Sequence, residues 1–142
     1  MVRPPQSRMG KATLAEQFEA QVAATPDAVA VVFDEQQLTY SELNTRANHL
    51  AQHLHQQYGV GPEVCVGLCM ERSVEMVVGL LGIVKAGGAY VPLDPGTPPE
   101  RLAFMLQDAD IALALTQDAL KAHFPAEWAG PVIALDTEWA PI

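Results

Sequence analysis

The chain has 142 residues, of which 49 % are hydrophobic and 18 % are charged. This length fits one domain, and the composition predicts a packed globular protein and excludes wholesale disorder. The net charge of −9 argues against nucleic acid as a partner, because an acidic protein repels the phosphate backbone.

Signals for export and for membrane insertion are both missing from the sequence. Residues 1–30 lack the compact apolar core of a secretory signal. The longest apolar run, over 74–84, is shorter than the roughly 20 residues that span a bilayer. The sequence therefore predicts a soluble, cytoplasmic protein that contacts no membrane. Residues 1–12 are predicted to be a flexible leader or linker, and 13–142 are predicted to form the domain.

Capping residues and periodicity predict most elements in chain order. Thr13 and Glu16 have the spacing of a capping box at the start of the first helix. Ser41 is predicted to cap the second helix, and Gly59 to end it. The expected elements are a helix over 13–24, strands over 28–33 and 38–40, a helix over 42–58, a strand over 64–70, a helix over 73–86, a strand over 89–93, a helix over 98–108, a strand over 111–115, a short helix over 117–123 and a strand over 132–135.

The order of these elements indicates the fold class. The first two strands flank a polar turn over 34–37 and are predicted to form a hairpin. After them, strands and helices alternate. That alternation predicts an α/β fold, with a mostly parallel sheet and helices on both of its faces.

The helix over 73–86 differs from an ordinary surface helix. Its residues 74–84 are apolar nearly all round, which is typical of a helix enclosed by protein on every side. A chain of this length has little material with which to enclose a helix, so the pattern favours a piece of a larger enzyme. Gly87 and Gly88 are predicted to supply the left-handed positions that end the helix.

Cysteines and histidines could suggest a disulfide or a metal site. Cys65 and Cys69 would lie about 13 Å apart on one strand at about 3.3 Å per residue, which is too far for a disulfide. They are predicted to be buried free thiols. His49, His53 and His55 share one helix, and the first two have a metal-binding spacing. His49 and His53 lie opposite the apolar stripe, and no acidic or cysteine ligand is placed to complete a metal shell, so a solvated helix face is the favoured interpretation.

Other candidate groups have similarly plain interpretations. The pair Gly87-Gly88 follows a helix C-terminus, whereas phosphate-binding glycines precede a helix N-terminus, so a structural turn is favoured. Lys85 complements the helix dipole, and Glu42 and Arg46 form an i, i+4 pair. Asp94 follows a strand, where carboxylates often act, but it has no evident partner. We find no catalytic constellation, so no catalytic, cofactor-binding or metal residue is predicted.

Two stretches of the chain resemble core motifs of the adenylation domains of nonribosomal peptide synthetases. The first runs over 38–43 and the second over 84–95, and the flanks extend the similarity to about residues 13–139. The motif residues, which we predict to be structural, are Leu38, Thr39, Tyr40, Glu42, Leu43, Lys85, Ala86, Gly87, Gly88, Ala89, Tyr90, Pro92, Leu93, Asp94 and Pro95.

The resemblance implies an activity for the parent protein. Such domains use ATP and magnesium to convert an amino acid into an aminoacyl adenylate. They then pass the acyl group to the phosphopantetheine thiol of a carrier domain. The family's phosphate loop, its specificity pocket and its catalytic lysine have no counterpart in these residues. The resemblance therefore implies an N-terminal fragment, truncated before the phosphate loop, that binds no cofactor and is inactive alone.

Two alternatives remain open at this point. The chain could be a non-catalytic docking subdomain, with the rest of the adenylation domain, a condensation or carrier domain, or a small MbtH-like protein as its partner. It could also descend from ligases that act on aryl or fatty acids. The form of the second motif, over 86–94, favours the peptide-synthetase branch.

Overall fold

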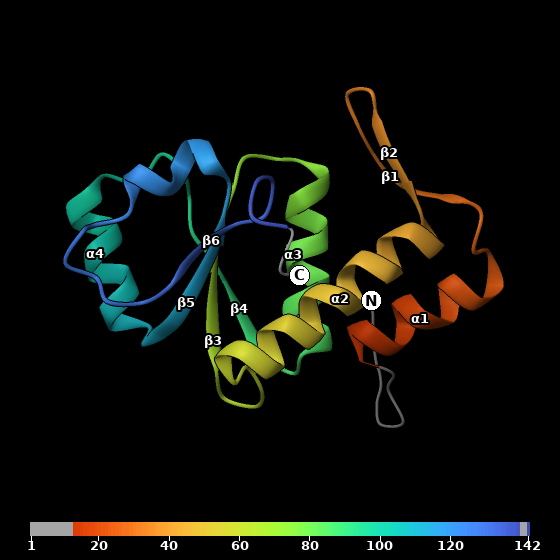
Figure 1. The fold of residues 1–142 in the computed structure, drawn as a ribbon, viewed down its shortest axis with the longest axis horizontal. Coiled ribbons are helices and arrows are strands. Elements are labelled where there is room, and N and C mark those ends of the chain that lie inside the picture. Colours follow the sequence, from red (N-terminus) through yellow and green to blue (C-terminus); the bar gives the residue numbers. More distant parts are fainter. Residues whose placement is uncertain (1–12, 140–141) are drawn as a thin grey trace, which may run out of the picture.

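Helices and strands follow the predicted order in the computed structural model, which describes residues 13–139 and 142 (Figure 1). The prediction of a leader over 1–12 lies outside the described residues. The elements are α1 (Leu14–Ala24), β1 (Val29–Phe33), β2 (Gln36–Thr39), α2 (Tyr40–Tyr58), β3 (Cys65–Cys69), α3 (Val74–Lys85), β4 (Ala89–Pro92), α4 (Pro99–Asp108), β5 (Ile111–Thr116), the 3-10 helix η1 (Asp118–His123) and β6 (Val132–Ala134).

The strands form two sheets. The β1 and β2 strands pair antiparallel and project from the body as the predicted hairpin (Figure 1). The other four strands form a parallel sheet in the order β4-β3-β5-β6. The α/β prediction is therefore confirmed. In this order β4 lies on one side of β3 and β5 lies on the other. The connection that follows β3 therefore leads toward one edge of the sheet, whereas the connection that follows β5 leads toward the opposite edge.

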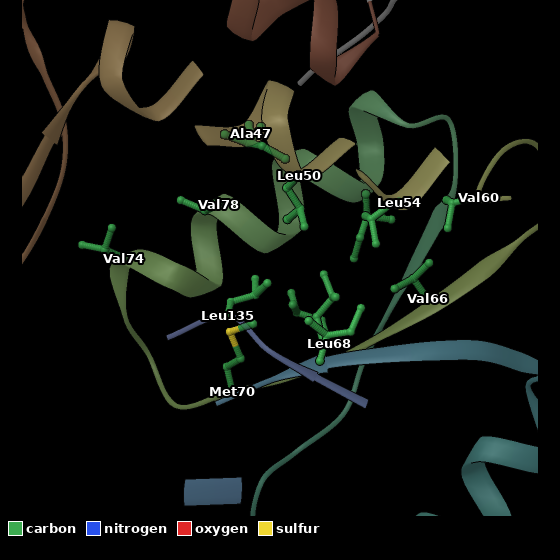
Figure 2. Packing of buried hydrophobic residues seen from close by; sticks show 14 of the residues in the cluster. Ala47, Leu50, Leu54, Val60, Val66, Leu68, Met70, Val74, Val78 and Leu135 are labelled. Atoms are coloured by element: carbon green, nitrogen blue, oxygen red, sulfur yellow. The ribbon is translucent and has the colours of Figure 1, made fainter. Parts of the chain in front are cut away.

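Helices cover both faces of the parallel sheet. The α2 and α3 helices lie on one side and α4 lies on the other (Figure 1). The larger apolar cluster sits between the sheet and the α2–α3 pair, and Figure 2 shows Leu50 and Leu54 of α2 above Val66 and Leu68 of β3. The smaller cluster joins α4, through Leu102 and Leu106, to the opposite face. Burial of these side chains is the main stabilising term of the fold.

The α3 helix is less enclosed than its sequence predicts. Six of its residues are buried against α2 and the sheet: Val74, Val78, Gly79, Leu81, Gly82 and Ile83. Met76, Val77 and Leu80 are only half-buried, and they form an apolar flank along one side of the helix. Within the part of the chain that the structure describes, this flank has no covering layer.

Two helices begin with the same capping arrangement. The capping box of Thr13 and Glu16 is confirmed at α1. At α2 the cap is Thr39 and not Ser41, because the extended Thr39 (φ −73°, ψ 167°) accepts the Glu42 N–H through its hydroxyl oxygen. The Glu42 carboxylate accepts the Thr39 N–H at 2.8 Å in return. The helix start predicted at residue 42 is therefore two residues too late.

The glycine pair after α3 serves two different purposes. Only Gly87 has the predicted left-handed conformation (φ 88°). Gly88 is needed for space, because a Cβ atom there would lie 2.7 Å from Val60 Cγ1 and 3.2 Å from the Val64 carbonyl oxygen. The prediction of two left-handed residues is thus wrong for Gly88. Among the described helices, none is both long and apolar enough to cross a bilayer.

Candidate functional site

The carboxyl ends of the parallel strands are the expected location of a ligand site in this fold. In open α/β sheets, ligands bind beyond these ends where neighbouring connections diverge. Here that point lies between β3 and β5, which end at Cys69 and Thr116. Beyond the buried Met70, the segments that follow the two strands are polar, so this edge of the sheet has the location and the chemistry of a possible binding site.

Side chains of the protein itself join the two strand ends. The Gln117 Oε1 atom accepts the Glu71 N–H at 2.9 Å, and Gln117 Nε2 donates to Ser73 Oγ at 3.1 Å. Behind them, the fully buried Thr116 hydroxyl donates to the Cys69 carbonyl at 2.6 Å. These bonds tie the end of β3 to the end of β5, so the groups that could receive a ligand already satisfy one another.

A second polar cluster continues along the same edge toward β6. Glu138 Oε2 accepts from Lys121 Nζ at 2.8 Å and from the Ala134 N–H at 3.0 Å. The hydrogen bond from Lys121, helped by the one from Ala134, holds the pKa of Glu138 below its usual value. Nearby, Asp136 Oδ1 accepts the Asp118 N–H at 2.9 Å and so fastens η1 to the end of β6. This cluster also fixes chain segments.

Cys69 is a buried thiol at this edge. Burial raises its pKa from 9.0 to about 11, and the Asp94 and Glu71 carboxylates act in the same direction. Below pH 9 such a thiol has a thiolate fraction about 100-fold smaller than one of pKa 9.0. A group kept this protonated is poorly suited to nucleophilic catalysis. Both cysteines are free, as predicted, although Cys65 is only half-buried.

We expect Cys69 to resist alkylation in the folded chain. At about pH 8.5, iodoacetamide should modify it roughly 100-fold more slowly than it does in the denatured chain, as followed by mass spectrometry of the Cys69 peptide. Since the folded state keeps this proton between pH 9 and 11 while the unfolded state loses it, the unfolding free energy should fall as the pH rises from 9 toward 11. Equal modification rates in the native and denatured chains would contradict this environment.

The structure places the first motif at the start of α2. Thr39 and Glu42 form the capping box, and Leu38 and Leu43 are buried in the larger cluster. Tyr40 lies against the Phe18 ring at a centroid distance of 6.0 Å. No ion pair joins Glu42 to Arg46 among the described residues, because Glu42 is used for capping and the Arg46 guanidinium lies over Trp139 at 5.9 Å. The predicted i, i+4 pair is therefore absent.

The second motif joins α3 to β4. Lys85 pairs with Glu19 of α1 at 2.5 Å, and its side chain is only 4 % exposed. Its ammonium also lies 5.6 Å from the centre of the Phe18 ring, so Lys85 fastens α1 to the end of α3. Leu93 is buried in the smaller cluster, and Asp94 Oδ1 accepts the Gly96 N–H at 2.8 Å in the turn after β4. The two motifs are not brought together into one pocket in the described part of the chain.

The remaining candidates do not assemble a metal centre. Within residues 13–139 and 142, no group of three or more histidine, cysteine or acidic side chains is placed to hold a metal ion. His49 and His55 are exposed on α2, and His53 packs edge-on against Tyr58. Sequence reasoning missed Gln117 and Glu138, although polar residues directly after an apolar strand would have been a usable signal for Gln117.

The sequence matches the family model described as AMP-binding enzyme over residues 18–140. It is 56 % identical over 123 residues to a linear gramicidin synthase of Brevibacillus parabrevis, and this match covers 87 % of this chain and 2 % of the synthase polypeptide. It is 52 % identical over 125 residues to a dimodular nonribosomal peptide synthase of Bacillus subtilis (strain 168), with 88 % and 5 % covered. The chain thus spans only a small part of these curated relatives.

The solved structures to which the fold is similar are also nonribosomal peptide synthetase proteins. The fold is similar to that of the nonribosomal peptide synthetase FmoA3, with a TM-score of 0.84 and 38 % identity over 89 % of this chain and 14 % of that one. It is also similar to the N-terminal subdomain of Klebsiella oxytoca NpsA, with a TM-score of 0.76 and 27 % identity over 87 % and 31 %. The chain therefore belongs to the family of AMP-binding enzymes, as an N-terminal segment of a nonribosomal peptide synthetase adenylation domain.

Proposed function

We propose that this segment serves as the structural scaffold of a domain that activates an amino acid. In the proposed reaction, the amino acid carboxylate attacks the α-phosphate of ATP, forming an aminoacyl adenylate and releasing pyrophosphate. Magnesium, when bound, would neutralise charge on the phosphates. The acyl group then passes to the phosphopantetheine thiol of a carrier domain, and adenosine monophosphate leaves.

Similarity to structures with adenylate-type ligands supports this activity for the whole domain. FmoA3 has been solved in an α-methyl-L-serine-AMP bound form and in an AMPPNP bound form. The NpsA N-terminal subdomain has been solved in complex with 3-hydroxybenzoyl-AMSN. The identity to gramicidin synthase favours an amino acid over an aryl or fatty acid as the substrate class.

The scaffold role rests on one observation above all. The ends of β3 and β5 are joined by Gln117 and Thr116, which hydrogen-bond to Glu71, Ser73 and Cys69. Several residues of the two motifs likewise cap, pack or pair within the segment: Thr39 and Glu42 cap α2, Leu38, Leu43 and Leu93 are buried, and Lys85 pairs with Glu19. We therefore propose that the two motifs fix helices and strands, and that the reacting groups belong to the remainder of the domain.

Pyrophosphate exchange tests this division of labour. The 142-residue chain should show no amino-acid-dependent exchange with any of the common amino acids, and calorimetry with ATP and magnesium should show no heat of binding. Joining the segment to the remainder of the matching adenylation domain of the linear gramicidin synthase should restore exchange. Exchange or micromolar ATP binding by the segment alone would contradict the scaffold role. An inactive joined domain that is folded would contradict the proposed activity.

Partners within a synthetase follow from the same proposal. The remainder of the adenylation domain would contact the segment directly. A carrier domain would accept the acyl group, and K. oxytoca NpsA has been solved as an artificial fusion of adenylation and carrier domains. A condensation domain and an MbtH-like protein are further partners that we propose for the complete domain. Size-exclusion chromatography of the joined domain with each partner tests these associations.

A further inference from the structure

We propose that α1 is a latch that opens and closes on the folded body of the segment, and that the buried charge of Lys85 controls it. In the open state, α1 leaves the α2–α3 pair while the parallel sheet stays folded. The movement belongs to the segment itself and is independent of the proposed function.

The α1 helix is attached at the surface of the molecule. It lies on the outer side of α2, away from the parallel sheet (Figure 1). None of the described residues Leu14–Ala24 is fully buried, and Ala15, Phe18 and Val22 are half-buried. The helix therefore adds little apolar burial to the larger cluster between α2, α3 and the sheet. Elements with few buried contacts open at a lower free energy than the whole protein unfolds.

Two motif residues contact α1. The centroids of the Phe18 and Tyr40 rings are 6.0 Å apart, and the Lys85 ammonium lies 5.6 Å from the centre of the Phe18 ring. Lys85 Nζ also donates to Glu19 Oε2 at 2.5 Å. Tyr40 begins α2 and Lys85 ends α3, so α1 joins the ends of two helices. One residue from each motif thus takes part in docking α1.

The ion pair between α1 and α3 is buried unequally. The Lys85 side chain is 4 % exposed, whereas that of Glu19 is 54 % exposed. Because α1 contributes the Phe18 ring and the Glu19 carboxylate that face the ammonium, docking takes the ammonium out of water and leaves the carboxylate hydrated. A buried charge without a partner is costly, so the closed state requires Glu19. Opening returns the ammonium to water and removes that cost.

An open α1 is also expected to lose its helix. It has 11 residues, and isolated helices shorter than about 12–15 residues are marginal in water. Its amide hydrogens would then exchange with solvent, whereas those of β3 and β5 stay protected within the parallel sheet. The exchange rate of the α1 amides therefore measures the opening of the latch.

Hydrogen exchange of the 142-residue chain, followed by mass spectrometry, tests the latch. In the wild type, the α1 peptides should exchange at least about tenfold faster than those of β3. Glu19→Gln leaves the Lys85 ammonium without its anionic partner, so it should speed exchange of α1 by about a further tenfold or more and leave β3 unchanged. Glu127→Gln is the matched control, because it removes the same charge from an exposed turn and should change neither rate.

Lys85→Met separates the effect of the buried charge from that of the ion pair. Methionine keeps an apolar stem against Phe18 while the Glu19 carboxylate stays hydrated, so exchange of α1 should remain within about threefold of the wild-type rate. Adding Glu19→Gln to Lys85→Met should then have no further effect. Equal release of α1 by Lys85→Met and by Glu19→Gln would overturn the control by the buried charge. Exchange that rises together in α1 and β3 of the Glu19→Gln variant would overturn the separate opening.

Labelling of lysine amines provides a second measurement. An N-hydroxysuccinimide ester of acetic acid should reach Lys85 when α1 is open, whereas it reaches Lys121, whose side chain is 39 % exposed, in either state. The ratio of Lys85 to Lys121 labelling should therefore rise at least about tenfold in Glu19→Gln. An unchanged ratio would overturn the proposal, because Lys85 would then have stayed covered without its partner.

Discussion

Replacing Gly82 with leucine is expected to lower the unfolding free energy of the chain by about 1–3 kcal/mol. A Cβ atom at position 82 would lie 2.5 Å from Leu50 Cδ2, 2.7 Å from Cγ and 3.0 Å from Cβ. Leu50 projects from α2 toward α3 and is fully buried (Figure 2), so its side chain cannot turn away without displacing its neighbours. Urea unfolding followed by circular dichroism measures the loss.

Gly61→Ala is the control for this substitution. No heavy atom lies within 4 Å of a Cβ placed there, and Gly61 does not have a positive φ. The control should therefore change the unfolding free energy by less than about 0.5 kcal/mol, like other substitutions away from packed sites. If Gly82→Leu leaves the unfolding curve unchanged, the close packing of α2 on α3 is wrong.

Leu50→Ala is the second substitution with a large expected effect, about 2–5 kcal/mol. The Leu50 side chain has no exposed surface and occupies the centre of the larger cluster, so its removal loses apolar burial and leaves a cavity. Thermal and urea unfolding measure this loss. A loss below about 1 kcal/mol would contradict the burial of the side chain.

The two positions should also be coupled. Gly82→Ala clashes with the Leu50 side chain in the wild-type background. In the Leu50→Ala background the Cγ and Cδ contacts are gone, and alanine gains about 1 kcal/mol of helix propensity over glycine. The contact with the Cβ atom of residue 50 at 3.0 Å remains, so Gly82→Ala should destabilise the Leu50→Ala variant less than it destabilises the wild type, as a double-mutant cycle measures. Additive effects would show that the two residues do not touch.

Much of the fold could be predicted because local signals and tertiary packing agree. The capping box at Thr13 and Glu16, the hairpin over 28–40 and the alternation of strands and helices all indicate elements that the structure contains. The start of α2 was less clear, because Thr39 and Ser41 are both good caps. Backbone geometry decides between them, since Thr39 is extended and Ser41 is already helical.

The candidate site could be predicted only in part. Strand order is set by tertiary packing, so the sequence did not show that β3 and β5 are neighbours, nor that Gln117 reaches Glu71, 46 residues away. Likewise, Lys85 had a local explanation in the helix dipole. Its pairing with Glu19 depends on how α1 packs against α3, which periodicity does not reveal. Contacts between distant segments therefore had to come from the structure.

The strand order β4-β3-β5-β6 also has a consequence for the sequence of events during synthesis. A growing chain can pair β3 with β4 early, but the other edge of β3 has no partner until β5 has been made. Because β3 is apolar on both faces, its unpaired edge is prone to association with other chains during that interval. Pairing over such long sequence separations is slow. Slow elongation between residues 92 and 111 would prolong this exposure, so misassembly in the cell should depend on translation speed there.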